Sequence, residues 1–567
     1  MRRHDMPPRA KCNSSLITER CSIIVEHRRR AACRLAQSAV AVDFPVLSKE
    51  GTIMLTRREF LRVSAGGMAA MALSDCRSDA AETLNAPPLP ADRTWLTLLT
   101  QGMEREYDYE AQVEGRLPAG LAGTLYRNGP GLFDRNGFGK WTLLDGDGMI
   151  RATSFADGKV RFRNRFIRTA KYLAEQSAGE FLYPTWTTPA PGFFANIPCI
   201  PTRSQAGITP VIKAGVLYAF DEVGGPYRVD PVTLDTNGEV DPYDGSPGTG
   251  PANYKAHTKT DARTGDWVLV GQRGRRNPQL HVVVKDSAGR QTRHVAYTGP
   301  RGSAYFHDFF WADPYVVFHL QPALLSPLPM LIGERTYADS LQWRPDQGSI
   351  LFVVDTTGSQ PPVALDVPAS WMWHALNAWR SGNTIVADFV GYDAPDHFLG
   401  PDASFRAIMH GRDGVATARG TLRRMTIDLA APRARVETIA AGHYEFPSVA
   451  QNRVGQPYRY GYVASQRAQQ GWFHDGIARI DVTSGNVDAY HFGSGHYVGE
   501  PVFVPDPAAR GDAGDDPGWL LAEVLEGASG TSFIAVFESS ALEDGPVAKV
   551  HLRHALPFSF HGWWDAA

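Results

Sequence analysis

Four histidines carry the chemistry that this sequence could perform: His257, His307, His374 and His561. Each lies in a strand-like segment rich in aromatic residues, and the segment around His374 reads Trp-Met-Trp-His-Ala-Leu-Asn-Ala-Trp. A single buried imidazole is more often a core group that needs one hydrogen-bond partner than a metal ligand. The same design at four places favours a metal site. The spacing matches no local motif such as His-x-x-x-His, so the fold would have to bring these residues together.

Three glutamates stand in apolar or glycine-rich surroundings where a charge is unexpected. They are Glu222 after Tyr-Ala-Phe-Asp, Glu445 in Tyr-Glu-Phe-Pro and Glu500 in Val-Gly-Glu-Pro-Val-Phe. Taken singly, each is more easily read as a surface residue. A metal-bound imidazole, however, usually donates its second ring N–H to a carboxylate. The three glutamates are therefore candidate partners of the histidines.

Most of the chain reads as short strands. Residues 267–272, 315–320 and 384–390 are β-branched and aromatic runs, and glycine turns such as Thr264-Gly265 and Gly382-Asn383 separate such runs. This pattern is typical of an all-β sandwich, barrel or propeller. The length of 567 residues favours a propeller, in which the innermost strands of different blades converge on one axis. No repeated motif defines the number of blades.

Composition excludes several classes of protein. A net charge of −3 and a pI near 6.6 give no reason to expect nucleic acid or an anionic membrane surface as a partner. A hydrophobic content of 43% with 13 tryptophans suffices for a large core. The sequence has no apolar run of about 20 residues, so we expect no transmembrane helix.

The N-terminal region predicts export. Residues 1–53 show no sustained period, and we expect them to be an upstream extension, with translation starting at Met54. Residues 54–76 join a pair of arginines to a short apolar run, which is typical of a twin-arginine signal. We therefore expect a periplasmic protein, with a cytoplasmic location as the alternative; lipidation of Cys76 stays open. Residues 77–95 read as a linker and 96–567 as one domain.

Residues 321–332 are aliphatic and hold three prolines, too broken for a helix or a central strand. One interpretation is a buried lid. The other is an apolar patch at a tunnel mouth, which would make peripheral contact with a membrane or an oily substrate. The sequence leaves both open.

Further motifs complete a family pattern. In chain order the sequence resembles the carotenoid cleavage oxygenases, the non-haem iron family that includes lignostilbene dioxygenases and the retinoid isomerase of the eye. The resemblance runs from about residue 113 to residue 564. It rests on Gly123-Thr-Leu-Tyr-Arg-Asn-Gly-Pro130, Asp145-Gly-Asp-Gly-Met149, Phe162-Arg-Asn-Arg-Phe-Ile-Arg-Thr169, the four histidine segments, Glu445-Phe-Pro and Gly499-Glu-Pro-Val-Phe.

The resemblance implies a fold and a site. The fold would be a seven-bladed β-propeller capped by a dome of loops and short helices. His257, His307, His374 and His561 would hold one Fe(II) per chain. Glu222, Glu445 and Glu500 would orient His307, His374 and His561 in that order, and His257 would rely on water. Aromatic residues beside the ligands would wall a dry tunnel: Phe306, Phe309, Trp373, Phe560 and Trp563.

The resemblance also implies an activity, cleavage of a C=C bond of a carotenoid or apocarotenoid by O2 to give two carbonyl products. Departures from the family pattern at Lys140, Leu144 and Ala312-Asp313 put the substrate in question rather than the metal. A stilbene substrate is the first alternative, and its phenol would need polar partners such as Lys171 or Tyr172. A propeller hydrolase or lactonase with calcium or zinc, and a non-catalytic binding propeller, are the alternatives from other classes. Iron near one per chain would separate the oxygenase from both.

Overall fold

The computed structural model divides the chain into two units, residues 1–80 and 81–567. In the first unit it describes one short hairpin, in which β1 (Val46–Ser48) pairs with β2 (Gly51–Ile53). The expected export signal, and the rest of the expected upstream extension, lie outside the described residues. The structure describes residues 46–48, 51–53, 84–103, 105–196, 203–274, 278–302, 304–331, 335–467, 471–508 and 516–566.

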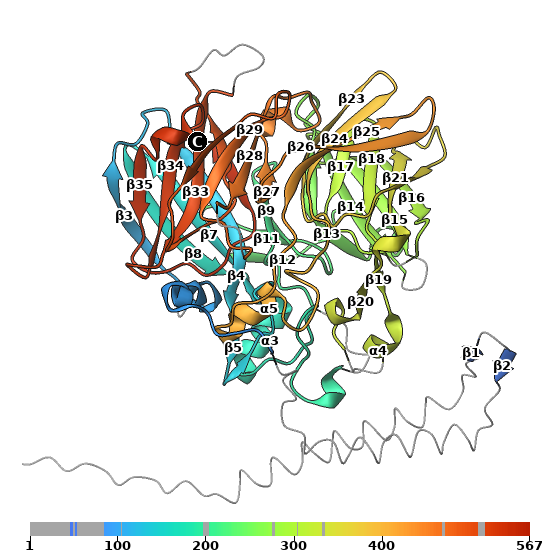
Figure 1. Cartoon of the computed structure of the whole chain (residues 1–567), viewed down its shortest axis with the longest axis horizontal. Coiled ribbons are helices and arrows are strands. Elements are labelled where there is room, and N and C mark those ends of the chain that lie inside the picture. Colours follow the sequence, from blue (N-terminus) through green and yellow to red (C-terminus); the bar gives the residue numbers. More distant parts are fainter. Residues whose placement is uncertain are drawn as a thin grey trace, which may run out of the picture. The chain divides into compact units, whose positions relative to one another are not determined.

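The second unit is built from antiparallel sheets in a propeller-like arrangement, as the strand pattern predicted (Figure 1). Five sheets have four strands each. Their strands are β9 (Thr209–Lys213), β10 (Val216–Phe220), β11 (Tyr227–Val229) and β12 (Thr236–Glu239); β13 (Asn253–Thr260), β14 (Trp267–Arg273), β15 (Gln279–Lys285) and β16 (Gln291–Thr298); β17 (Phe309–Ala312), β18 (Tyr315–Leu320), β21 (Ser349–Asp355) and β22 (Val363–Val367); β23 (Ala375–Ser381), β24 (Thr384–Gly391), β25 (Thr421–Asp428) and β26 (Arg433–Ala440); and β27 (Tyr444–Ser448), β28 (Tyr460–Ser465), β29 (Gly476–Asp481) and β30 (Val487–His491).

The remaining long strands form one ten-stranded sheet instead of two further separate blades. The cause is β3, whose residues Asp108–Ala111 pair with β8 while Gln112–Gly115 pair with β35. The expected seven separate blades are therefore not found, because β3 joins the outer edges of two strand groups. The sheet contains β3 (Asp108–Gly115), β4 (Gly123–Leu132), β7 (Asp147–Ala156), β8 (Lys159–Phe166), β31 (His496–Val498), β32 (Val502–Pro505), β33 (Gly518–Glu526), β34 (Thr531–Glu538), β35 (Ala548–His551) and β36 (Gly562–Ala566).

Most residues of the middle strands are buried because both faces of these sheets are covered. In β18, Val316, Phe318 and Leu320 belong to one apolar cluster, whereas Val317 on the opposite face belongs to another. A strand that contributes to two cores must lie between two neighbouring sheets. The near-continuous β-branched and aromatic runs of the sequence follow from this packing.

Most of the short helices, among them α3, α4 and α5, gather at one end of the sheets, at the bottom of Figure 1. Helix α3 (Ala170–Ala178) begins where the Thr169 hydroxyl accepts the N–H of Tyr172, and it ends at Gly179 in the left-handed conformation. The other short elements are η2 (Ala91–Thr100), β5 (Asp134–Arg135), β6 (Phe138–Gly139), η3 (Phe193–Asn196), β19 (Ala323–Leu325), α4 (Pro327–Leu331), η4 (Ala338–Ser340), β20 (Leu341–Trp343), η5 (Pro345–Gln347), α5 (Ser404–Ala407), η6 (Ile408–His410), η7 (Gln451–Arg453) and η8 (Leu542–Asp544). Among the described residues, no helix is long and apolar enough to cross a membrane.

Two local expectations are corrected. Residues 321–332 do form regular structure, the strand β19 and the one-turn helix α4, because prolines are tolerated in the first turn of a helix. The expected linker is packed in its second half: Leu89 is buried and its N–H bonds the carbonyl of Gly411. The apolar side chains Ala86 and Leu89 supply the burial that the proline-rich composition concealed.

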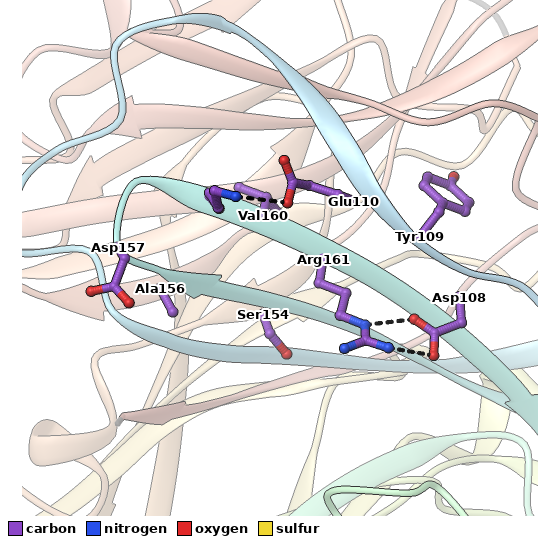
Figure 2. A pocket seen from close by; sticks show the side chains of 9 residues that line it. Asp108, Tyr109, Glu110, Ser154, Ala156, Asp157, Val160 and Arg161 are labelled. Atoms are coloured by element: carbon purple, nitrogen blue, oxygen red, sulfur yellow. Dashed lines mark hydrogen bonds and ion pairs between the residues drawn. The ribbon is translucent and has the colours of Figure 1, made fainter.

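A shallow hollow lies on the outer edge, where β3, β7 and β8 meet, and most of its charged side chains are ion-paired (Figure 2). Arg161 is held by both carboxylate oxygens of Asp108 at 2.6 and 2.8 Å, and Lys159 lies 3.3 Å from Glu110. These pairs neutralise one another at the surface.

Candidate metal centre

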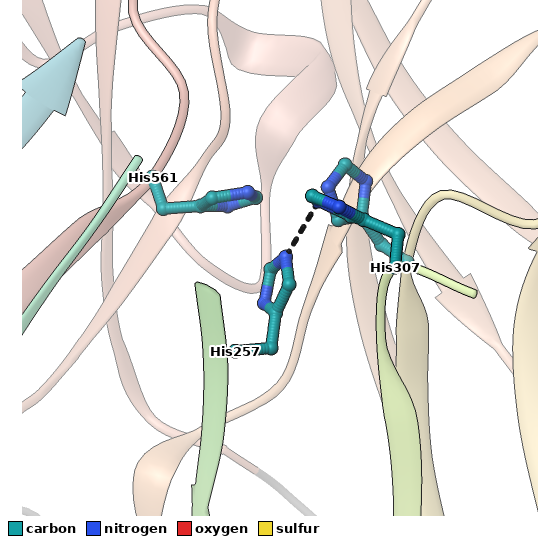
Figure 3. A group of neighbouring side chains, drawn as sticks. His257, His307 and His561 are labelled. Atoms are coloured by element: carbon teal, nitrogen blue, oxygen red, sulfur yellow. Dashed lines mark hydrogen bonds between the residues drawn. The ribbon is translucent and has the colours of Figure 1, made fainter. Parts of the chain in front are cut away.

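The structure brings the four predicted histidines together. His257 lies in β13, His307 lies two residues before β17, and His374 and His561 immediately precede β23 and β36. One ligand atom from each ring lies within 4.8 Å of the others, and all four side chains are buried. Figure 3 shows the rings of His257, His307 and His561 turned toward a common centre, with 3.1 Å between Nε2 of His257 and Nε2 of His307.

Irregular strand pairing accompanies these residues. The register of β13 with β14 shifts between Tyr254 and Thr258, which brackets His257. The register of β23 with β24 shifts between Ala375 and Asn377, directly after His374. Extra residues in a strand re-aim side chains and are common beside functional sites. Here they turn imidazoles out of the sheet toward the axis.

The three predicted glutamates lie behind three of the rings. Glu222 Oε1 is 2.8 Å from Nδ1 of His307, Glu445 Oε2 is 2.6 Å from Nδ1 of His374, and Glu500 Oε1 is 2.9 Å from Nδ1 of His561. Each carboxylate holds the nitrogen that faces away from the centre. The Nε2 atoms are thereby left to face it, as in the outer shell of a metal site.

Burial fixes the charge of these groups. Desolvation, followed by the neighbouring histidines, holds the pKa of His257 well below its usual value, and desolvation lowers the pKa of His561 to about 4. Burial alone would raise the pKa of Glu222, but Lys255 and His307 lower it to about 2. The lowered pKa values keep His257, His307 and His561 neutral at neutral pH, and Glu222 and Glu500 ionised.

This donor set fits a transition metal. Nε2 of His561 is buried and has no hydrogen-bond partner among the described residues, although a buried nitrogen normally has one. Neutral imidazoles suit zinc, copper, iron or nickel, whereas calcium prefers carboxylate and carbonyl oxygens. A metal ion bound by the four Nε2 atoms would satisfy the unpartnered nitrogen.

Asp308 is a residue of the site that the sequence pattern did not single out. Its Oδ2 atom lies 3.9 Å from Nδ1 of His257, too far for a hydrogen bond. The same oxygen accepts the N–H of Ala375 and the Nζ of Lys259, both at 2.9 Å. Among the described residues no carboxylate lies within hydrogen-bond distance of His257, but the buried carboxylate of Asp308 lies close by. The His307-Asp308 dipeptide was the available signal.

The expected aromatic wall is found only in part. Phe306 and Phe309 pack inside a core between sheets. Trp373 does contact the ring of His307, with 5.3 Å between centroids, and Phe446 stacks on His374 at 5.4 Å. Phe446 was missed because it is defined by its contacts across the axis and not by its neighbours in sequence.

The two candidate partners for a phenol are engaged elsewhere. Nζ of Lys171 lies 2.8 Å from Asp147 and 2.7 Å from Glu175, and all three side chains are buried. Tyr172 stacks on Phe166 with 5.4 Å between ring centroids. The ammonium group of Lys171 is therefore not free to bind a substrate hydroxyl.

Comparisons with known proteins agree with one another. Residues 100–566 match the family model described as retinal pigment epithelial membrane protein. The apocarotenoid-15,15'-oxygenase of Synechocystis is 30% identical over 82% of this chain and 94% of its own length. The isoeugenol monooxygenase of Pseudomonas nitroreducens is 28% identical over 82% of this chain and 96% of its own. The crystal structure of cobalt-substituted Synechocystis ACO superposes with a TM-score of 0.77 at 28% identity, covering 84% of this chain and 99% of that one.

Proposed function

We infer that this chain, which belongs to the carotenoid oxygenase family represented by retinal pigment epithelial membrane protein, is a ferrous-iron dioxygenase that cleaves a C=C bond of an apocarotenoid. The observation that carries the inference is the group of four buried imidazoles, three of them backed by carboxylates. That donor set, in a member of this family, supports iron as the ion.

The bound ferrous ion would supply a Lewis-acidic site with open positions for O2. One C=C bond breaks and two C=O bonds form, so both oxygen atoms of O2 are consumed and no external reductant is needed. The chain's own residues orient the metal-binding rings and exclude water. Glu222, Glu445 and Glu500 orient the rings, and Trp373 with Phe446 keeps water from the apolar side of the centre.

The substrate class is supported by two observations. The relative at 30% identity is named for an apocarotenoid, and buried aromatic side chains contact the histidines, Trp373 at His307 and Phe446 at His374. The second candidate is a phenylpropenoid or stilbene alkene. It is favoured by the similarity to isoeugenol monooxygenase and to the lignostilbene-alpha,beta-dioxygenase isozyme III of Sphingomonas paucimobilis, each 28% identical.

We further infer that the propeller has seven blades, with the ten-stranded sheet counted as two. Strands β4, β7, β8 and β36 would make one blade and β32–β35 the other, with β3 bridging their outer edges. Strand β36 contacts β9 on one side and β32 on the other, which supports closure of the ring at this point.

Two further proposals concern location. Residues 54–76 support export to the periplasm by the twin-arginine route. Leu328 of α4 and Leu173 of α3 are exposed by 67% and 54%, and both helices lie at the same end of the domain in Figure 1. Exposed leucines of this kind support peripheral contact with a membrane in which an oily substrate dissolves.

The test is product analysis. The purified chain is loaded with Fe(II) without oxygen, then given 18O2 with an apocarotenal, a hydroxystilbene or isoeugenol. We expect two carbonyl fragments from the apocarotenal, each formed only when both Fe(II) and O2 are present. Preferred cleavage of the hydroxystilbene or isoeugenol would assign the second candidate. Hydrolysis of an ester or lactone with calcium or zinc, and no cleavage of any alkene, would overturn the proposal.

A further inference from the structure

The three carboxylates behind the histidines are not equivalent, although their distances to the rings are alike. Two of them have a buried cationic partner. Glu222 is ion-paired with Nζ of Lys255, and Oε2 of Glu500 lies 3.3 Å from Nη1 of Arg127. In the described part of the chain, neither a lysine nor an arginine is ion-paired with Glu445.

Lys255 is built into the site. It lies two residues before His257 in β13, and its side chain is buried. Its ammonium group lies 4.5 Å from the ring centroid of Phe306 and 5.2 Å from that of Tyr305, so aromatic faces cover it. The contact with Glu222 uses Oε2, while Oε1 faces His307. One carboxylate thus joins the lysine to the ring.

The Glu500 pair repeats this design with an arginine. Nη1 of Arg127 also donates to the carbonyl of Glu500 at 2.9 Å, and Nη2 donates to Ser559 Oγ at 2.9 Å. The guanidinium therefore connects Glu500 with the segment that leads to His561. In this pair too, the charge of the carboxylate is matched by a fixed cation.

Glu445 has no such compensation. Its Oε2 atom is shared by Nδ1 of His374 and the backbone N–H of Phe446. Its Oε1 atom is buried and has no hydrogen-bond partner in the part of the chain that the structure describes. A buried carboxylate without a cation is costly unless a positive charge is added nearby. A metal ion bound to His374 would supply that positive charge to Glu445.

We propose that Lys255 is a positioning residue that neutralises Glu222 and fixes it against His307, so that the Glu445–His374 pair alone carries an unbalanced negative charge toward the metal. This inference rests on the proposed function only in requiring a divalent ion at the four histidines. With Lys255 in place, the Glu222–His307 pair only fixes the orientation of the His307 ring. The Glu445 pair contributes both orientation and charge.

This charge arrangement determines the direction in which metal affinity changes in each variant. Removing the charge of Glu222 alone leaves the Lys255 ammonium unpaired close to a divalent ion, and two positive charges at such a distance repel strongly in a buried site. Glu222→Gln should therefore weaken metal binding, and removing the lysine as well should restore part of it. Glu445→Gln leaves no unpaired cation behind, so removing Lys255 in that background should restore nothing.

The experiment measures the dissociation constant of Co(II) by competition with a chelator. The proteins are the full-length wild type, E222Q, E222Q/K255M, E445Q and E445Q/K255M, each checked for folding by circular dichroism. We expect K255M to tighten Co(II) binding about 10-fold in the E222Q background and by less than about 2-fold in the E445Q background. If the K255M substitution prevents folding in either background, K255Q takes its place in both.

The matched backgrounds separate the explanations. Equal tightening in both would mean that Lys255 acts on the whole centre and not through Glu222, and weaker binding in both would mean that it only packs; either result overturns the proposal. If the wild-type chain binds Co(II) but shows no selective rescue, this inference alone fails. If the wild-type chain does not bind Co(II), the proposed metal centre fails with it.

Discussion

The carboxylate of Asp308 accepts a hydrogen bond of 2.9 Å from the backbone N–H of Ala375, and this bond joins the segment that carries His307 to the segment that carries His374. Asp308 is buried and also binds Lys259 and the N–H of Phe309. Two metal-binding side chains from neighbouring sheets are thus positioned by one carboxylate that binds neither of them directly.

Replacing Asp308 by Asn removes one acceptor oxygen and the charge while it keeps the shape. The N–H of Ala375 or of Phe309 then loses its acceptor, which costs about 1–3 kcal/mol when the group is buried. We expect metal affinity to fall about 10-fold, as for other outer-shell changes. Co(II) titration and thermal unfolding check this. The matched control is Asp313→Asn, where only half-exposed pairs with Arg263 and Arg293 are lost and Co(II) affinity should not change.

Replacing His374 by Ala tests the ligand assignment. Large apolar clusters between neighbouring sheets hold the fold together and do not include His374, so we expect a folded β-protein that neither retains iron nor cleaves substrate. Metal analysis and far-ultraviolet circular dichroism measure the two outcomes. Retention of iron and of turnover by His374→Ala would mean that the four histidines are not the ligands.

Acid should destabilise the fold through buried neutral histidines. Burial lowers the pKa of His319 to about 3, below the unfolded value near 6.5. A lowered pKa in the folded state means that the unfolded chain binds more protons, so the stability is present above pH 6.5 and is lost as the pH falls toward 3. The loss is at most about 1.4 kcal/mol per pH unit for each such group.

The corresponding variant is His319→Gln, which cannot titrate. We expect its free energy of unfolding, measured in urea between pH 7 and pH 4, to fall less steeply than that of the wild type. His551→Gln, at an exposed position, is the control and should keep the wild-type slope. An unchanged slope in His319→Gln would show that His319 is not held neutral by the fold.

The apolar segment gives a test of membrane contact. Leu328 is 67% exposed, so Leu328→Ser should leave stability within about 0.5 kcal/mol of the wild type. It should weaken sedimentation with phosphatidylcholine vesicles and slow cleavage of a membrane-dissolved substrate. Leu325 instead packs against the large aromatic cluster, so Leu325→Ser should lower the melting temperature. Unchanged vesicle binding by Leu328→Ser would count against the membrane interpretation.

Much of the fold class could be read from the sequence because strand runs and glycine turns are local signals. The blade count could not, because the junction at β3 depends on which distant strand each half of Asp108–Gly115 meets. Residues 321–332 were read as irregular because a count of prolines ignores where a proline stands within a helical turn.

The candidate site, too, could be predicted from the sequence only in part. The four histidines were found from their repeated aromatic context, and the pairing of each glutamate with its ring came from the family resemblance. Lys255, Arg127 and Asp308 were not recognised, because a buried cation or carboxylate looks like an ordinary surface residue until its partner is known. Phe446 was missed because its stacking on His374 joins residues that are distant in sequence.

The most direct test of the account is the metal itself. The full-length chain is purified without oxygen, its metal content is determined, and X-ray absorption at the iron edge counts the nitrogen ligands. The account predicts one Fe(II) per chain with four imidazole nitrogens. An ion bound by oxygen ligands, or a chain that binds no iron while correctly folded, would contradict it.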